Sequence, residues 1–158
     1  MQEIRFAICN ELIDLAKKHN EKLTPMKLQK LVFFIYGYYK ARTGNSIFDD
    51  ERFQVWQFGP VLPSLYYYFK GYGTNSINKY AIRFDGFLPK LSKEAILNFD
   101  LNQTISYVWK KFGHKNAIEL SGLTHKENTP WDKARKRNSL YIDDNDIEEY
   151  FKKELLND

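Results

Sequence analysis

The chain has 158 residues, of which 43% are hydrophobic and 16% aromatic, and its net charge is +4 from 24 basic and 20 acidic side chains. This length suits one domain of ordinary size, and the apolar fraction supplies enough material for a core, which excludes an intrinsically disordered chain. The positive excess is small compared with that of dedicated nucleic-acid binders, which concentrate basic charge on one face. A weakly basic surface fits an acidic protein partner as well as a phosphate backbone.

The single cysteine, Cys9, excludes an internal disulfide and a cysteine-based zinc site. It stands among Ile4, Ile8 and Leu12 at helical spacing, which is the usual environment of a buried, unreactive thiol. The first residues lack the apolar run of a signal peptide, and no run of about 18 apolar residues occurs. The sequence therefore predicts a cytoplasmic protein without a membrane-spanning helix.

Two helices are predicted in the first third of the chain. Over residues 2–18, apolar side chains recur at three- and four-residue intervals, the spacing of an amphipathic helix. A second helix is expected over residues 25–43, with Thr24 as N-cap, Pro25 at the first helical position and Gly44 after its end. Its apolar residues cover nearly all sides, and such a helix is normally buried. Residues 25–43 are therefore predicted to form the central helix.

A glycine stands in the middle of this apolar helix. Gly37 costs about 1 kcal/mol relative to alanine in a helix interior. We expect that a neighbouring element approaches the helix closely at this position.

The middle of the chain is predicted to contain short elements. Residues 53–58 alternate loosely and are rich in β-forming side chains, which indicates a strand. The glycine and prolines of residues 59–63 are expected to end it. Ser64 is expected to cap a short helix that runs through Phe69. A second strand is expected over residues 80–84 and would pair with the first.

Two further helices are predicted after the second strand. The first begins with Ser92 as N-cap and runs to Gly113. Whether residues 98–102 interrupt this helix stays open. A short helix follows over residues 116–123.

The C-terminal part is also predicted to be helical. Thr129 and Pro130 repeat the N-cap and first-position signal and open a helix through Arg137. The last helix begins near Asp143. The fold class expected is therefore mainly α, a single compact helical domain over residues 1–158 with a buried central helix and a small β-pair.

The motifs contain no convincing active site. His125 and Glu127 have the His-x-Glu spacing of zinc deaminases, but the Pro-Cys-x-x-Cys that completes such a site is missing. No serine stands in a glycine-flanked strand–turn–helix elbow, and residues 71–73 lack the third glycine of a dinucleotide fingerprint. We therefore expect a protein that is not an enzyme, with no catalytic residues, metal or cofactor. A metal-dependent hydrolase or deaminase is the least favoured alternative.

One segment has the features of a partner-binding surface. Between Trp56 and Tyr68, two prolines within four residues restrict φ and stiffen the loop. Three successive tyrosines cannot all face inward, because successive helical residues differ by about 100°, so at least one is exposed. Exposed aromatics on a rigid support make good interface anchors. The alternative interpretation is that these tyrosines cover the core and leave their hydroxyl groups in water. The candidate partner-binding residues are Trp56, Phe58, Tyr66, Tyr67, Tyr68 and Arg135.

A second segment combines polar and aromatic residues near a predicted helix start. Glu127 precedes that start, where negative charge is favoured by roughly 0.3–1 kcal/mol. Trp131 and Arg135 are one turn apart and are expected to stack. The favoured interpretation is a structural corner that locks two helices together, with a direct ligand site as the alternative. The signature residues of this corner are His125, Glu127, Pro130 and Trp131.

Basic residues gather in residues 110–115 and 126–137. Glu119 lies between these two segments, and Glu127 and Asp132 lie within the second. Such a mixture usually forms a solvated helix surface. The alternative is a nucleic-acid-binding regulator, whose phosphate contacts would make its affinity fall steeply with salt.

Three stretches of the sequence resemble a known family. They are residues 25–38 (PMKLQKLVFFIYGY), 53–66 (FQVWQFGPVLPSLY) and 123–135 (LTHKENTPWDKAR). Their order and spacing resemble the Panacea domain, that is, the SocA-like antitoxin or phage-associated protein family. Residues 69–77 (FKGYGTNSI) add to the similarity.

The resemblance implies a bacterial or prophage-borne antitoxin that neutralises a protein toxin by direct contact and has no established catalytic residues. The toxin is expected to be encoded by an adjacent gene. Because members of the family neutralise many unrelated toxins, the resemblance does not identify the toxin. It also leaves open whether the antitoxin blocks a site on the toxin or delivers the toxin to proteolysis. Some relatives carry an appended DNA-binding domain, for which this length leaves no room. A transcriptional or phage-associated regulator is the alternative, and exposed aromatics suit a homodimer as well as a heteromer.

Overall fold

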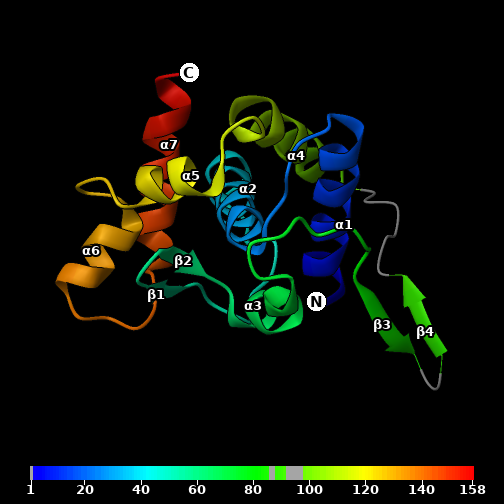
Figure 1. Cartoon of the computed structure of the whole chain (residues 1–158). Coiled ribbons are helices and arrows are strands. Elements are labelled where there is room, and N and C mark those ends of the chain that lie inside the picture. Colours follow the sequence, from blue (N-terminus) through cyan, green and yellow to red (C-terminus); the bar gives the residue numbers. More distant parts are fainter. Residues whose placement is uncertain (1, 86–87, 92–97) are drawn as a thin grey trace.

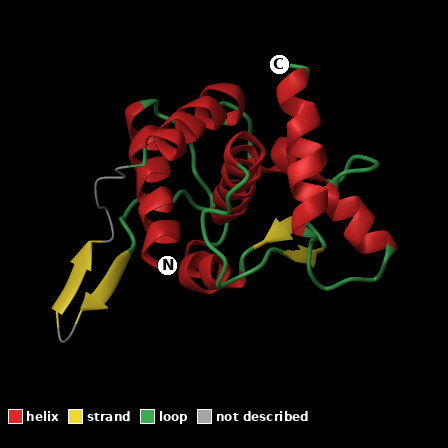
Figure 2. Cartoon of the chain, turned by 180° about the vertical axis from the view of Figure 1, so that it is seen from behind, coloured by secondary structure: helices red, strands yellow, loops and turns green. Residues whose placement is uncertain are grey.

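The computed structural model describes residues 2–85, 88–91 and 98–158. Helices dominate these residues, and two short antiparallel hairpins accompany them (Figure 1, Figure 2). The predicted fold class, mainly α with a buried central helix and a small β-pair, is confirmed, with a second pair added. In chain order the elements are α1 (Gln2–Lys18), α2 (Pro25–Thr43), β1 (Gln54–Trp56), β2 (Gly59–Val61), α3 (Pro63–Phe69), the 3-10 helix η1 (Lys70–Tyr72), β3 (Ile82–Asp85), β4 (Leu88–Leu91), α4 (Phe99–Phe112), α5 (Ala117–Thr124), α6 (Pro130–Lys136) and α7 (Asp144–Leu156).

Helix α2 is the central element, with the bounds that the sequence predicts. Every residue from Lys27 to Tyr39 is buried, and α1, α4, α5 and α7 surround the helix in Figure 1. The hydroxyl of Thr24 accepts a hydrogen bond from the backbone N–H of Lys27, and Gly44 ends the helix at a φ of 75°. Local capping therefore sets both ends of α2, while packing from all sides keeps it buried.

Aromatic rings join α2 to α7. The ring of Phe151 meets those of Phe33 and Tyr38 edge-on, with centroids 5.6 and 4.8 Å apart. A Cβ added to Gly37 would lie 2.1 Å from the Phe151 ring. The expectation that Gly37 permits a close approach is therefore confirmed, and the approaching element is α7.

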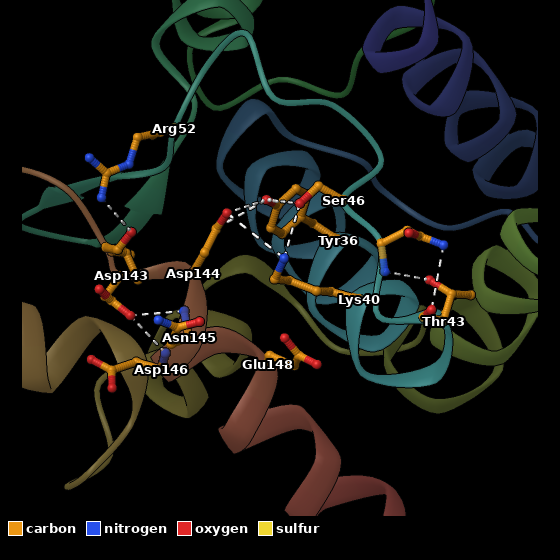
Figure 3. A network of polar contacts seen from close by, with 12 residues as sticks. Tyr36, Lys40, Thr43, Ser46, Arg52, Asp143, Asp144, Asn145, Asp146 and Glu148 are labelled. Carbon is orange, nitrogen blue, oxygen red and sulfur yellow. Dashed lines mark hydrogen bonds and ion pairs between the residues drawn. The ribbon is translucent and has the colours of Figure 1, made fainter.

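A polar network holds the start of α7 against the C-terminal half of α2 (Figure 3). Asp143 caps α7 by accepting from the backbone N–H groups of residues 145 and 146. Tyr36 donates its hydroxyl hydrogen to Asp144 at 3.0 Å, and Lys40 donates to Ser46 at 3.0 Å. Burial, together with the nearby Asp144 carboxylate, raises the pKa of Tyr36 to about 12.

The first hairpin corrects the predicted strand pairing. Strand β1 pairs with β2, the segment directly after it, with Gln54 opposite Val61 and Trp56 opposite Gly59. The predictions that residues 59–63 only end the strand, and that residues 80–84 pair with it, were wrong. The turn lacks the Asn-Gly or Asp-Gly signal of a two-residue hairpin. Instead, Gly59 adopts a φ of 114°, which returns the chain alongside β1.

The second hairpin projects from the body beside α1 (Figure 1). Here β3 pairs with β4, with Ile82 opposite Leu91. The side chain of Asn10, which is fully buried in α1, bonds to both the carbonyl oxygen and the N–H of Ala81, at 3.2 and 2.8 Å. This pair of bonds joins the base of the hairpin to the core.

Two helices, α3 and α4, start differently from the predictions. Helix α3 begins at Pro63, and Ser64 is not its cap, because both its N–H and its hydroxyl bond to Glu51, at 3.0 and 2.5 Å. The Glu51 carboxylate thus satisfies a free N–H of the first turn from outside the helix. Helix α4 begins after Asn98, whose side chain accepts from the N–H of Leu101. The predicted N-cap Ser92 lies outside the described residues.

The described helices are all too short or too polar to cross a lipid bilayer.

Candidate functional site

The backbone of residues 56–62, which comprises the end of β1, the turn, β2 and the link to α3, is held by side chains from three helices. Five of its carbonyl oxygens accept hydrogen bonds from side chains. Four of the donors lie on α2, α5 and α6, and the fifth is His125, the residue directly after α5. The donors are Trp131 to Trp56 O (2.8 Å), His125 Nε2 to Gln57 O (3.0 Å), Ser121 to Phe58 O (2.7 Å), Lys30 to Pro60 O (3.1 Å) and Gln29 to Leu62 O (3.0 Å).

Two further contacts fit the hairpin closely onto the helices. The side-chain oxygen of Gln29 accepts from the N–H of Leu62 at 3.0 Å, so this amide bonds to both backbone groups of one residue. A Cβ added to Gly59 would lie 2.6 Å from the hydroxyl of Thr124. The hairpin backbone is therefore fixed by long-range contacts, although a two-stranded hairpin alone is only marginally stable in water.

The fixed backbone displays a group of aromatic side chains. Phe58, at the hairpin turn, is 56% exposed, and Tyr67 on α3 is 62% exposed. Trp56 and Tyr66 meet edge to face with centroids 4.8 Å apart, and Tyr66 contacts Tyr67 at 5.4 Å. We call these four residues, Trp56, Phe58, Tyr66 and Tyr67, the aromatic surface.

A groove of about 470 Å³ lies next to the aromatic surface, between the first half of α2, the hairpin and α3. None of the described residues that line it is acidic. Its lining includes Met26, Lys30, Trp56, Phe58, Tyr66 and Lys70. Lys30 is only 1% exposed, and its burial lowers the pKa of the ammonium group to about 7.

Tyr68 lies apart from the aromatic surface. Its ring packs against Phe6 of α1, with centroids 4.9 Å apart, and its hydroxyl accepts from the N–H of Ile82 at 2.8 Å. All three successive tyrosines are exposed, so the expectation of at least one exposed tyrosine is confirmed. The Tyr68 hydroxyl, however, supports the start of β3.

The predicted corner joins the first hairpin to α5 and α6. The rings of His125 and Trp131 are nearly perpendicular with centroids 4.1 Å apart, and both residues donate to the hairpin. The guanidinium of Arg135 lies 5.5 Å from the centre of the Trp131 ring, so the expected stacking is confirmed. Pro130 takes the first position of α6. The corner thus locks a hairpin onto two helices, whereas the sequence predicted a helix–helix lock.

Glu127 takes no part in these contacts. It is exposed and forms no hydrogen bond or ion pair within residues 2–85, 88–91 and 98–158. The acidic residue of the corner is Asp132, which accepts from the N–H of Asn128 at 2.9 Å and pairs with Lys136 at 2.8 Å. The bonds from Lys136 and Asn128 lower the pKa of Asp132. Asp132 takes this role because it lies inside the first turn of α6, where its carboxylate reaches back to the N–H of Asn128, just before the N-cap Thr129.

Much of the predicted basic surface is paired with acidic side chains. Asp132 pairs with both Arg135 and Lys136, and Arg137 pairs with Asp146 at 2.7 Å. Lys111 is paired with Asp158. These pairs reduce the positive charge that α6 and α4 would offer to a phosphate backbone.

Sequence reasoning missed three of the five hairpin donors, namely Gln29, Lys30 and Ser121. One signal was available for the first two. Gln29 and Lys30 are consecutive polar residues in a helix that is otherwise apolar on nearly all sides, and buried polar groups require partners. Nothing local marks Ser121, because its acceptor is 63 residues away in the chain.

Comparison with known proteins places these features in a family. Residues 28–132 match the family described as "Antitoxin SocA-like, Panacea domain". Over 131 residues the chain is 30% identical to "Antitoxin SocA" of Caulobacter vibrioides (strain NA1000 / CB15N), which covers 80% of this chain and 67% of that protein. No solved structure matches the chain. The matched range extends from the first turn of α2 through both hairpins to the Trp131 corner, and the chain belongs to the SocA-like antitoxin family with a Panacea domain.

Proposed function

We propose that this protein is a cytoplasmic antitoxin that neutralises a protein toxin by direct binding through the aromatic surface. The observation that carries the proposal is the set of five side-chain bonds to the backbone of residues 56–62. A backbone held in this way loses little conformational entropy on binding, so exposed aromatics on it make strong anchors. We expect residues 1–158 to act as one domain, since one cluster of buried residues joins α1 to α7.

The proposed antitoxin acts by binding and has no catalytic activity of its own. The thiol of Cys9 is fully buried, and burial raises its pKa, which keeps it protonated and unreactive near neutral pH. His125, which has a catalytic interpretation together with Glu127, uses Nε2 to hold the hairpin backbone. The Cys9 thiol and the His125 imidazole are thus committed to the fold.

Co-expression tests the proposal most directly. Each open reading frame adjacent to this gene is induced in a bacterial host alone and together with this protein. We expect one neighbour to arrest growth, this protein to restore growth, and the two proteins to elute together. If no neighbour arrests growth, or if this protein rescues none that does, neutralisation of an adjacent toxin is excluded.

Alanine variants test the surface assignment. Because truncation of a central aromatic anchor typically costs about 1–3 kcal/mol of binding free energy, Phe58→Ala and Tyr67→Ala should each weaken toxin binding at least fivefold. Phe99→Ala is the matched control, since Phe99 on α4 is 72% exposed and lies outside the surface. Equal affinities for Phe58→Ala, Tyr67→Ala and Phe99→Ala would show that the toxin binds elsewhere.

A further inference from the structure

Lys30 is a buried cation without an acidic partner. Its side chain is among those that line the groove and is 1% exposed. An ammonium group has three N–H donors, and in Lys30 one of them bonds to Pro60 O at 3.1 Å. The other two find no acceptor, and the group forms no ion pair, within the described part of the chain. Buried donors left in this state are costly, and an incoming acceptor would relieve that cost.

A second lysine stands at the same groove. Lys70 is exposed, and its ammonium group lies 5.2 Å from the centre of the Tyr67 ring. The described lining contains these two lysines, two glutamines and no acidic side chain, and the rest of it is mainly apolar or aromatic. Low-dielectric walls strengthen the field of the two cations. The groove is therefore complementary in charge to a carboxylate and in surface to an apolar side chain.

We propose that this groove accepts a segment of the partner protein in which an apolar side chain stands next to a carboxylate, with the carboxylate facing Lys30 and Lys70. The partner is the toxin if the proposed function holds, and the inference rests on that function in this respect alone. The chemistry of the groove can be tested without the toxin.

The charge state of Lys30 makes such binding depend on pH. Burial lowers the pKa of Lys30 to about 7, so the group is only partly charged near neutrality. An adjacent carboxylate raises this pKa, and binding therefore takes up a proton above pH 7. Affinity is greatest below pH 7 and decreases as the pH rises, by up to about tenfold for each pKa unit that the ligand adds. Besides Lys30, the titratable side chains that line the groove are Tyr66 and Lys70. Lys27 and Tyr67 are adjacent in sequence to lining residues, and His125 bonds to the carbonyl oxygen of the lining residue Gln57.

The first experiment uses small probes on the unaltered protein. Binding of 3-phenylpropionate and of its neutral analogue 3-phenylpropionamide is followed by NMR through the indole N–H signal of Trp56, which lines the groove. We expect the carboxylate to bind about tenfold more tightly than the amide at pH 6, because charge-assisted hydrogen bonds are the stronger kind. This preference should shrink by pH 9. Equal binding of acid and amide at pH 6, or binding of neither probe, overturns the inference.

Two methionine variants identify the responsible lysine. Lys30→Met should fold, since a neutral side chain of similar length replaces a buried charge, and it should lose the preference for the acid and its pH dependence. Lys70→Met, at the exposed rim, should weaken the acid about twofold and keep the pH dependence. A pH dependence that persists in Lys30→Met would come from another group and would contradict the assignment.

The same variants separate this inference from the proposed function. If toxin neutralisation occurs but is unaffected by Lys30→Met, the antitoxin proposal stands and the partner chemistry proposed for the groove is wrong. If no adjacent toxin exists but the acid probe binds with the expected preference and pH profile, the groove chemistry stands and the partner is a different protein.

Discussion

Gly37 shows how one missing side chain sets a helix contact. It lies on the face of α2 that meets Phe151, where an added Cβ would approach the ring to 2.1 Å. The nearest atoms belong to an aromatic ring that is itself 1% exposed and packed against Phe33 and Tyr38. Such a ring has little freedom to move away, so the contact between α2 and α7 depends on this glycine.

Gly37→Ala should therefore destabilise the protein. Overpacking lowers the free energy of unfolding by about 1–3 kcal/mol. The higher helix propensity of alanine offsets at most about 1 kcal/mol of this loss. We expect a net loss of about 1–2 kcal/mol in the free energy of unfolding, measured by urea denaturation. Gly122→Ala is the matched control, because Gly122 is also helical and has no atom within 4 Å of an added Cβ. It should be neutral or stabilise by up to about 1 kcal/mol, and equal effects of the two would refute the steric explanation.

At the scale of elements, the first hairpin is stabilised more by side-chain hydrogen bonds from the surrounding helices than by the pairing of its own two strands. Its strands have three residues each, and an isolated hairpin of that size would not persist. The side-chain donors of α2, α5 and α6 supply the missing stabilisation. This arrangement couples the aromatic surface to buried side chains of the surrounding helices, such as Ser121.

Ser121→Ala tests this coupling. It removes one donor to the hairpin turn and should cost about 1 kcal/mol, which corresponds to about fivefold faster hydrogen exchange in residues 57–61. Binding of the proposed toxin should weaken although Ser121 is buried. Thr43→Ala is the control, since its hydroxyl also bonds to a backbone carbonyl, at 2.8 Å, but at the far end of α2. Unchanged exchange of the hairpin in Ser121→Ala would show that its bond does not hold the turn.

The sequence predicts the helices well because their signals are local. Helices α1 and α2 have the predicted bounds, and the Thr129 cap of α6 is present as expected. The strand partner of β1 was missed because the turn has no characteristic dipeptide and its geometry depends on distant donors. The exposure of aromatic residues near the hairpin was predictable from local spacing, whereas Gln29, Lys30 and Ser121 act over long range and were not predicted as hairpin donors.

At the scale of the whole molecule, burial of ionisable groups gives stability an unusual dependence on pH. Lys30 releases its proton at about pH 7 in the folded state, whereas an unfolded lysine holds it to about pH 10. Tyr36 and Tyr150 hold theirs to about pH 12 when folded and release them near pH 10 when unfolded. The Cys9 thiol also has a raised pKa. The lysine therefore favours folding at high pH, and the other three oppose it.

The free energy of unfolding should consequently rise between about pH 7 and pH 9 and fall above pH 10. In the first range the unfolded chain binds more protons through Lys30, and in the second it binds fewer through the tyrosines, each contributing up to about 1.4 kcal/mol per pH unit. Urea denaturation from pH 6 to pH 11 measures the curve. Lys30→Met should remove or reduce the rise, and Lys70→Met should keep it. A rise of unchanged size in Lys30→Met would disprove the role of Lys30.

The bonds that hold residues 56–62 end on carbonyl oxygens, which every amino acid carries. The path of the loop is thus independent of the side chains that it displays. Substitutions at Gln57 and Phe58 in this loop, and at the exposed Tyr66 and Tyr67 on the adjoining α3, can change the displayed surface without altering its scaffold. Antibodies are built in a similar way, with variable binding residues on loops that a rigid scaffold positions. Such a separation of framework from displayed residues makes the protein evolvable: a library randomised at these four positions should remain folded while its specificity is redirected to new targets.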